Sequence, residues 1–206
     1  MRGITNLSSG KMGFALARAA RQAGAEVTLV AGPVHLATPA QVRRVDVQSA
    51  LQMHVAVLSL AAAQDVFIAT AAVADWRPVQ AHGQKIKKAG RTSAPAIEMT
   101  ENPDILAAVA ALADGPGGGP LCIGFAAETE NLAQYARAKL LRKRVALIVG
   151  NIGPTTFGRD DNALLLVDAN GDRVLPRSDK HSLARQLVAE IADRLNALQP
   201  GPKRSP

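Results

Sequence analysis

The sequence contains a single cysteine, Cys122, among 206 residues. One thiol excludes an intramolecular disulfide and a metal site built from several thiolates, and it favours a reducing compartment such as the cytoplasm. Aromatic residues make up only 3% of the chain, so a hydrophobic core has to be largely aliphatic. The same shortage argues against an aromatic platform that stacks single-stranded bases. We therefore expect a cytoplasmic protein that binds no nucleic acid.

Long apolar runs are also missing. No stretch approaches the length of a membrane span, and the segment from Met1 to Gly13 lacks the apolar core of a signal peptide. The four histidines, His35, His54, His82 and His181, show no metal-ligand spacing. We expect no association with a membrane and no histidine metal site.

Apolar residues and positive charge are plentiful. Hydrophobic residues account for 48% of the chain, which is enough for a sizeable core, and the length suits one domain. We expect this domain to span residues 1–198 and residues 199–206 to form a disordered tail. The formal net charge of +7 favours a ligand that carries phosphate, without indicating which one.

Short apolar segments alternate with helical patterns along the chain. We expect strands at 26–31, 42–47, 65–72, 95–100, 121–127 and 145–149, and a hairpin at 163–167 and 172–175. Helical patterns start at 11, 49, 105 and 182, and a further basic helix precedes residue 145. In the helix at 49–63, Leu51, Val55, Leu58 and Ala62 share one face. This alternation predicts a mostly parallel α/β sheet with right-handed crossovers.

The opening stretch, residues 5–14, begins a helix in a turn rich in serine and glycine. Ser8 and Ser9 are of the types that cap helices, and Gly10 and Gly13 let the backbone approach a ligand or a neighbouring strand. A helix that begins this way presents unpaired N–H groups and the positive end of its dipole, which suits a phosphate. An ordinary capped helix, packed through its glycines, explains this stretch equally well.

Unusual residues follow the predicted strands, at the edge of a parallel sheet where ligands bind. A lysine cluster at 85–88 is either a solvated charge run or a flexible lid over a polyphosphate. Lys139 and Lys143 share a helix face, which suits a phosphate site or an ordinary surface helix. Asp75 suits a turn, a ribose contact or a Mg²⁺ ion.

Two other function classes compete with phosphate-transfer chemistry. A nicotinamide oxidoreductase normally carries G-x-G-x-x-G and an acid after its second strand. Here the opening glycines lack that spacing, and the strand at 26–31 runs into Gly32 and Pro33. The other alternative is a basic nucleotide-binding module without chemistry, which would bind nucleotide and turn nothing over.

Five motifs occur in a specific order, at residues 6–13, 71–77, 85–88, 102–105 and 124–129. Together they resemble phosphopantothenoylcysteine synthetase, also called phosphopantothenate–cysteine ligase, of coenzyme A biosynthesis. The resemblance implies a Rossmann-like α/β fold with helices on both faces of the sheet and a small β-hairpin extension. It implies that CTP and Mg²⁺ activate 4′-phosphopantothenate as an acyl-cytidylate, and that the amine of L-cysteine then displaces CMP.

The resemblance also implies partners and residue roles. Family members are dimers, usually fused behind a flavin-dependent decarboxylase, and carry a strand ahead of Arg2 that this sequence does not contain. Asn6 is expected to contact the acyl group, Lys85 to stabilise charge during activation, and Arg2 to assist the cysteine step. The expected nucleotide site comprises Ser8, Gly10, Ala69, Thr70, Ala71, Asp75, Lys85, Pro103, Asp104, Ile105, Leu106, Phe125, Lys139 and Lys143. Asp75 is also the expected Mg²⁺ ligand.

Overall fold

The computed structural model describes residues 6, 8–80, 96–115, 118–127, 130–151 and 161–198. The predicted tail, residues 199–206, lies outside the described residues. In chain order the elements are α1 (Lys11–Gln22), β1 (Thr28–Ala31), β2 (Arg43–Asp46), α2 (Ala50–Ala61), β3 (Val66–Ala69), β4 (Trp76–Pro78), β5 (Met99–Glu101), α3 (Ile105–Ala110), the 3-10 helix η1 (Ala111–Asp114), β6 (Leu121–Ala126), α4 (Leu132–Lys143), β7 (Leu147–Asn151), β8 (Asp161–Asp168), β9 (Gly171–Asp179) and α5 (Lys180–Leu198).

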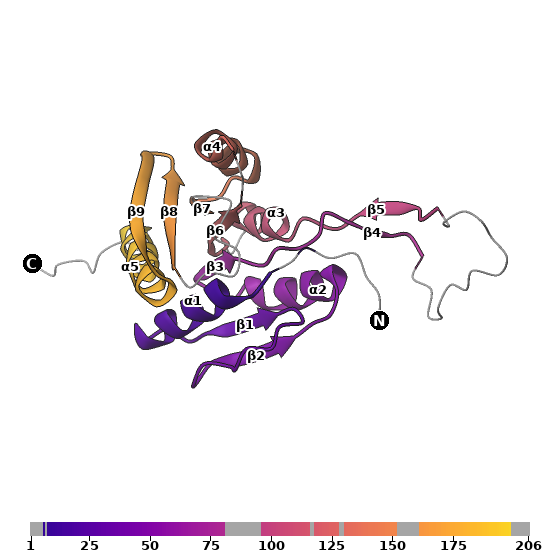
Figure 1. Ribbon diagram of the computed structural model, residues 1–206, viewed down its shortest axis with the longest axis horizontal. Helices are drawn as coiled ribbons and strands as arrows, with labels where there is room; N and C mark the ends of the chain where they lie inside the picture. The colour runs from indigo at the N-terminus through magenta and orange to yellow at the C-terminus, as the bar shows by residue number, and fades with distance from the viewer. Residues whose placement is uncertain are drawn as a thin grey trace, which may run out of the picture.

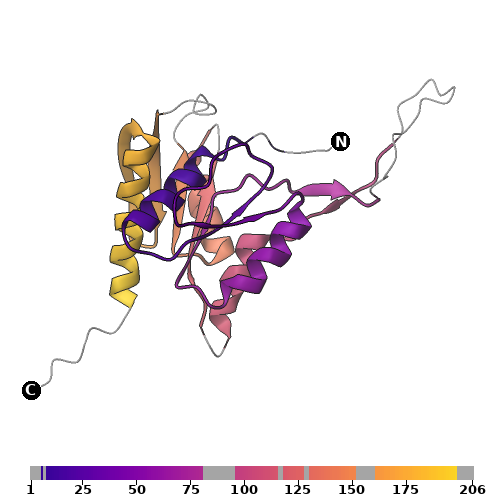
Figure 2. The same cartoon turned by 90° about the horizontal axis from the view of Figure 1, so that it is seen from below.

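The main sheet has five strands in the order β3-β6-β7-β8-β9 (Figure 1). β3, β6 and β7 are parallel, and β8 and β9 continue the sheet as antiparallel strands. β1 and β2 form a separate parallel pair, and β4 and β5 form an antiparallel arm that projects from the body (Figures 1 and 2). The predicted hairpin is thus longer than expected and belongs to the main sheet.

Helices cover both faces of this sheet, as predicted. Because side chains alternate along a strand, Ile123 of β6 packs in a core with residues of α1 and α5, while Cys122 packs in a second core with residues of α2, α3 and α4. Both cores are largely aliphatic. None of the helices in the described ranges is both long and apolar enough to cross a bilayer.

The predicted face of α2 is mostly exposed, and of its four residues only Leu58 is partly buried and packs against the core. Leu51 and Val55 are 43% and 67% exposed, whereas Met53, Val57 and Ala61 are buried. Nearly every position of this helix is apolar, so periodicity does not distinguish the two faces. The start of the helix is better determined, because the Ser49 hydroxyl accepts a hydrogen bond from Gln52 N and completes a capping box.

Several predicted boundaries shift by a few residues. The predicted strand 65–72 ends at Ala69, where its ladder with β6 ends opposite Gly124. The predicted strand 95–100 becomes the shorter β5, and the helix that opens at Asp104 tightens into η1 after Ala110.

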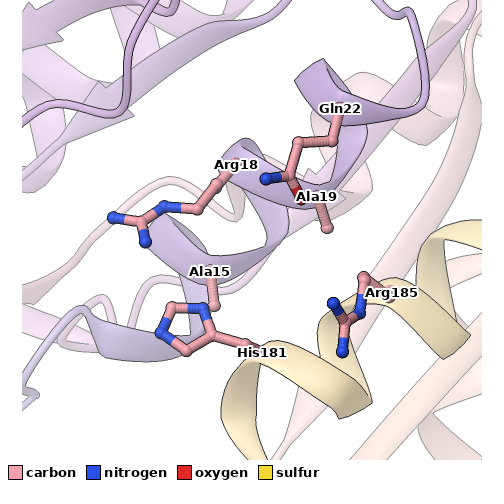
Figure 3. Close-up of a pocket in the computed structure, with 6 residues that line it drawn as sticks. All are labelled: Ala15, Arg18, Ala19, Gln22, His181 and Arg185. Atoms are coloured by element: carbon pink, nitrogen blue, oxygen red, sulfur yellow. The ribbon is translucent and has the colours of Figure 1, made fainter.

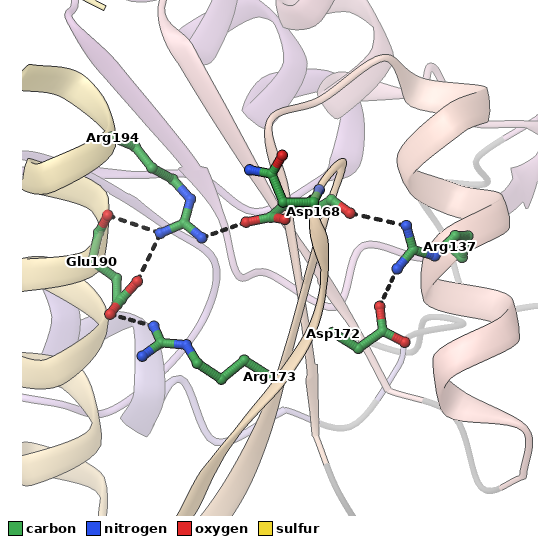
Figure 4. A network of polar contacts seen from close by, with 7 residues as sticks. Arg137, Asp168, Asp172, Arg173, Glu190 and Arg194 are labelled. Atoms are coloured by element: carbon green, nitrogen blue, oxygen red, sulfur yellow. Dashed lines mark hydrogen bonds and ion pairs between the residues drawn. The ribbon is translucent and has the colours of Figure 1, made fainter. Parts of the chain in front are cut away.

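Charged side chains tie α4, the β8–β9 turn and α5 together (Figure 4). Arg194 of α5 donates to Asp168 at 2.6 Å and to the Glu190 carboxylate at 2.8 Å. From the other side, Arg137 of α4 donates to the Asp168 carbonyl at 2.9 Å and also pairs with Asp172. This network fixes the outer edge of the sheet against helices from both faces.

Candidate functional site

The start of α1 lies against the end of β3. Gly13, in the first turn of α1, is so close to Thr70 that an added Cβ would lie 2.7 Å from the Thr70 hydroxyl oxygen. A Cβ at this position would force the Thr70 side chain to move, so glycine permits this close contact. The first turn of α1 and the segment after β3, both predicted to bind nucleotide, are therefore adjacent.

The cap of α1 differs from the expectation for Ser8 and Ser9. The N-cap residue is Gly10, in the left-handed conformation with φ +70°, and it makes no side-chain cap. The two serine hydroxyls instead accept hydrogen bonds at 3.4 Å from the N–H groups of Gly10 and Lys11. These bonds are long, so an anionic oxygen could replace the hydroxyls as the acceptor.

Asn6 reaches the segment that follows β3. Its Nδ2 donates to the Val73 carbonyl at 3.2 Å, across 67 positions of sequence. The same segment is held from its other side by Asn102, whose Nδ2 donates to the Ala74 carbonyl at 2.8 Å and whose N–H donates to the Asp75 carbonyl at 2.7 Å. Two asparagines thus fix the loop that carries Asp75.

The start of α3 joins this neighbourhood to the end of β6. Asp104 caps α3 by accepting from Ala107 N at 3.0 Å, and it forms an ion pair with Lys143 of α4. Leu106 packs against Gly124, where an added Cβ would lie 2.6 Å from its Cδ2.

Lys139 of α4 lies at the same edge of the sheet. Its Nζ donates to the Phe125 carbonyl of β6 at 2.7 Å. Lys139 and Lys143 were predicted to share a helix face. Both side chains reach this edge of the sheet, where Lys139 contacts the end of β6 and Lys143 contacts the start of α3.

Asp75 is the expected Mg²⁺ ligand, and its surroundings limit what kind of metal site it can form. In the part of the chain that the structure describes, no group of three or more His, Cys, Asp and Glu side chains could hold a metal ion. Mg²⁺ is commonly held by one or two carboxylates together with substrate phosphates and water. The exposed Asp75 fits that arrangement and does not fit an all-protein metal cage.

The described residues thus bring most of the predicted site together. It comprises Asn6, Ser8 and Gly10 before α1; Ala69, Thr70, Ala71 and Asp75 at and after β3; Pro103, Asp104, Ile105 and Leu106 at α3; Phe125 of β6; and Lys139 and Lys143 of α4. The predicted catalytic residues Arg2 and Lys85 lie outside the described residues.

Sequence reasoning missed the structural role of Asn102. It belongs to the motif that opens α3, yet it also holds the Asp75 loop and accepts a hydrogen bond from Arg77 Nη1 at 3.3 Å. Its position directly before Pro103 was the available signal, since that pair often marks a turn.

Cys122 is a core residue and not a candidate nucleophile. The thiol is buried within β6, and its Sγ lies 3.3 Å from the Pro120 carbonyl oxygen. Burial raises the pKa of Cys122 to about 11. A thiol that stays protonated and enclosed is unsuited to nucleophilic catalysis.

A cavity of about 150 Å³ lies elsewhere, between α1 and α5 (Figure 3). Its lining consists of Ala15, Arg18, Ala19, Gln22, His181 and Arg185. None of the predicted site residues belongs to it.

Comparisons with known proteins identify the family of this chain. The family model of the DNA/pantothenate metabolism flavoprotein C-terminal domain matches residues 1–195. Two relatives named Coenzyme A biosynthesis bifunctional protein CoaBC, from Vibrio cholerae and Escherichia coli K12, are each 50% identical over 198 residues. These alignments cover 95% and 94% of this chain, and 49% and 48% of the relatives. The chain thus spans about half the length of the curated relatives it matches.

Solved structures share the fold. The crystal structure of the C-terminal domain of Coenzyme A biosynthesis bifunctional protein CoaBC matches with a TM-score of 0.78 at 38% identity, over 96% of this chain and 88% of that one. A Cab2 mutant in complex with phosphopantothenate-cysteine gives a TM-score of 0.77 at 15% identity, over 96% and 81%, and supports the fold alone. The resemblance inferred from the five sequence motifs is confirmed. The chain belongs to the family of the DNA/pantothenate metabolism flavoprotein C-terminal domain.

Proposed function

We propose that this chain is a phosphopantothenate–cysteine ligase that uses CTP. The proposal rests on one observation. In this member of the family, the start of α1, the loop that carries Asp75 and the start of α3 lie next to one another. The Gly13–Thr70 contact and the two asparagine bonds hold these three segments in one place before any substrate arrives. Preorganised polar groups of this kind are the usual source of catalysis in phosphoryl chemistry.

The reaction consists of two displacements. In the first, a carboxylate oxygen of 4′-phosphopantothenate attacks the α-phosphorus of CTP, the bond to the β-phosphate oxygen breaks, and pyrophosphate leaves. In the second, the amine of L-cysteine attacks the acyl carbon, loses a proton and displaces CMP, which leaves an amide. Both steps develop negative charge on oxygen, which positive and N–H groups stabilise.

The chain's own residues supply these groups in the proposal. Asn6, fixed by its bond to the Val73 carbonyl, contacts the acyl group. The N–H groups at the start of α1, with Ser8, Lys139 and Lys143, bind the triphosphate. Because Lys143 pairs with Asp104 and Lys139 bonds the Phe125 carbonyl, both ammonium groups are already positioned near the α3 start and the end of β6. Lys85 is expected to stabilise charge during activation, and Arg2 is expected to assist the cysteine step. Both residues lie outside the described residues, so these roles stay predictions.

Mg²⁺ belongs to this proposal as the ion that neutralises the phosphates when bound, with Asp75 as its protein ligand.

A cytoplasmic location also remains a prediction, supported by the single buried cysteine.

We also propose that the protein is a homodimer that works beside a flavin-dependent decarboxylase. The β4–β5 arm supports the dimer, because Trp76, Val79 and Ile97 are 51%, 48% and 54% exposed on it. Large apolar side chains that project on an arm favour burial by a partner.

The decarboxylase is supported by the bifunctional name of relatives about twice as long as this chain.

Product formation tests the activity. We expect phosphopantothenoylcysteine to form only when CTP, 4′-phosphopantothenate and cysteine are all present, with more pyrophosphate released from CTP than from ATP. Equal or greater activity with ATP would contradict the choice of nucleotide. Nucleotide binding without turnover would instead favour the inert module, and a change in nicotinamide absorbance would favour an oxidoreductase.

Two variants separate the half-reactions. Lys85→Gln should lose acyl-cytidylate formation by about 10²- to 10³-fold, the usual effect of removing one transition-state contact. Asn6→Asp places a carboxylate beside the acyl group, so it should still form the intermediate and convert it slowly. Mass spectrometry of intermediate and product distinguishes the two, and unchanged intermediate formation in Lys85→Gln would remove that lysine from the mechanism.

A further inference from the structure

A loop from another part of the fold supports the Gly10 turn. Residues 32–42 connect β1 to β2, and the side chains of Val34 and Leu36 pack onto Gly10. An added Cβ at Gly10 would lie 3.2 Å from a Val34 methyl carbon and 3.4 Å from a Leu36 methyl carbon. The loop thus covers the residue whose left-handed backbone begins α1.

One guanidinium group holds this loop in place. Arg44 of β2 donates from Nη1 to the Leu36 carbonyl at 2.7 Å and from Nη2 to the Val34 carbonyl at 3.3 Å. Its Nε donates to Asp46 at 2.7 Å, and its Cζ lies 5.3 Å from the centre of the Phe14 ring in α1. The side chain is only 19% exposed.

These contacts link three segments through a single side chain. Arg44 joins the strand that carries it, the loop that covers Gly10, and α1 itself through Phe14. A lysine could not reproduce them, because the planar guanidinium donates in several fixed directions and stacks on a ring, whereas an ammonium group acts as a point charge. Surface arginines without such contacts are normally replaceable at little cost.

We propose that Arg44 is a positioning residue for nucleotide binding, which acts by fixing the 32–42 loop against Gly10 and so holding the Ser8–Gly10 turn in its binding conformation. The inference rests on the proposed function, because it assumes that this turn binds the triphosphate. Arg44 itself does not touch substrate. Its loss should therefore weaken nucleotide binding and leave the chemical step largely intact.

The test compares Arg44→Met and Arg44→Lys with two controls. Arg43→Met changes an exposed neighbour on the same strand, and Arg194→Met breaks the ion network of Figure 4 at the edge formed by β8 and β9. We expect both Arg44 variants to raise the KM and the Kd for CTP about tenfold, because small misplacements of binding groups have effects of this size or larger. The kcat and the KM for cysteine should change less than twofold. Arg43→Met should match the wild type.

Arg194→Met separates positioning from general loss of stability. It should lower the thermal midpoint and leave the KM for CTP unchanged. An unchanged KM and Kd for CTP in folded Arg44→Met, or an equal rise in Arg194→Met, would overturn the inference. If Arg44→Met does not fold, Leu36→Ala removes a loop contact with Gly10 while Arg44 stays, and an unchanged Kd for CTP in that variant would equally overturn it. Failure of the wild type to bind CTP would instead contradict the proposed function itself.

Discussion

At the scale of single residues, the candidate site depends on two glycines that allow its segments to pack closely. Gly13 and Gly124 each lie where an added Cβ would come within 2.7 Å or less of a neighbouring side chain. The first contact joins α1 to the end of β3, and the second joins α3 to β6. Both glycines were part of the motifs that indicated the family, and the structure gives each of them a packing reason.

Gly13→Ala tests the first of these contacts. Alanine favours a helix over glycine by about 1 kcal/mol, but the clash with Thr70 should outweigh this gain and lower the free energy of unfolding by about 1–2 kcal/mol. Chemical denaturation measures the change. In a Thr70→Ala background the hydroxyl is gone, so the same substitution should become neutral or stabilising. Equal destabilisation in both backgrounds would show that Thr70 is not the obstacle.

At the scale of elements, α5 packs its apolar face into the core shared with α1, and Arg194 adds an ionic connection to the edge of the sheet. Its hydrogen bond, together with one from Arg173, holds the pKa of Glu190 below its usual value despite partial burial. A lowered pKa in the folded state means that this contribution to stability is present at neutral pH and is lost as the pH falls below about 4.5 and the carboxylate takes up a proton.

Arg194→Met should therefore lower the free energy of unfolding at pH 7 by about 1–3 kcal/mol, since its bonds to carboxylates are lost. The difference from the wild type should shrink as the pH is lowered toward 3, because the wild type loses the same interactions. Arg185→Met, on the same helix, removes an exposed side chain that contacts Ser182 and should change stability by less than about 0.5 kcal/mol. A difference that stays constant with pH would rule out the ionic explanation.

Most of the elements could be predicted because strand and helix patterns alternate clearly along this chain, but the short strand β4 (Trp76–Pro78) could not, because its three residues are too few to show apolar alternation. The core face of α2 could not, because Leu51 and Met53 are equally apolar and only the neighbouring elements decide which is buried. The candidate site residues come from the motifs and stay a prediction, while the support from Asn102 and Arg44 depends on contacts across 28 and 10 positions that no local pattern encodes.

At the scale of the whole molecule, the β4–β5 arm projects from the body (Figure 2). Trp76, Val79 and Ile97 are exposed on it. The body is built around two cores, one on each face of the main sheet, and the arm contributes little to either. An arm of two three-residue strands is too small to be stable through its own packing. The proposed dimer explains how it is stabilised.

Trp76→Glu should consequently shift the protein from dimer to monomer, because a carboxylate at the centre of an apolar contact is costly to bury. Sedimentation velocity measures the change. Val55→Glu is the matched control, since it introduces the same charge at an exposed apolar position on α2, which is not part of the arm. A wild type that sediments as a monomer, or a Trp76→Glu variant that remains a dimer, would contradict an interface on the arm.

The proposed first step is the attack of the carboxylate of 4′-phosphopantothenate on the α-phosphorus of CTP. The most direct measurement uses 4′-phosphopantothenate labelled with ¹⁸O in its carboxylate, together with CTP, Mg²⁺ and cysteine, and analyses the nucleotide product by mass spectrometry. Attack by the carboxylate predicts that each CMP carries one ¹⁸O atom and that the pyrophosphate carries none. Unlabelled CMP, or amide formation with label in inorganic phosphate and CDP as the other product, would contradict it.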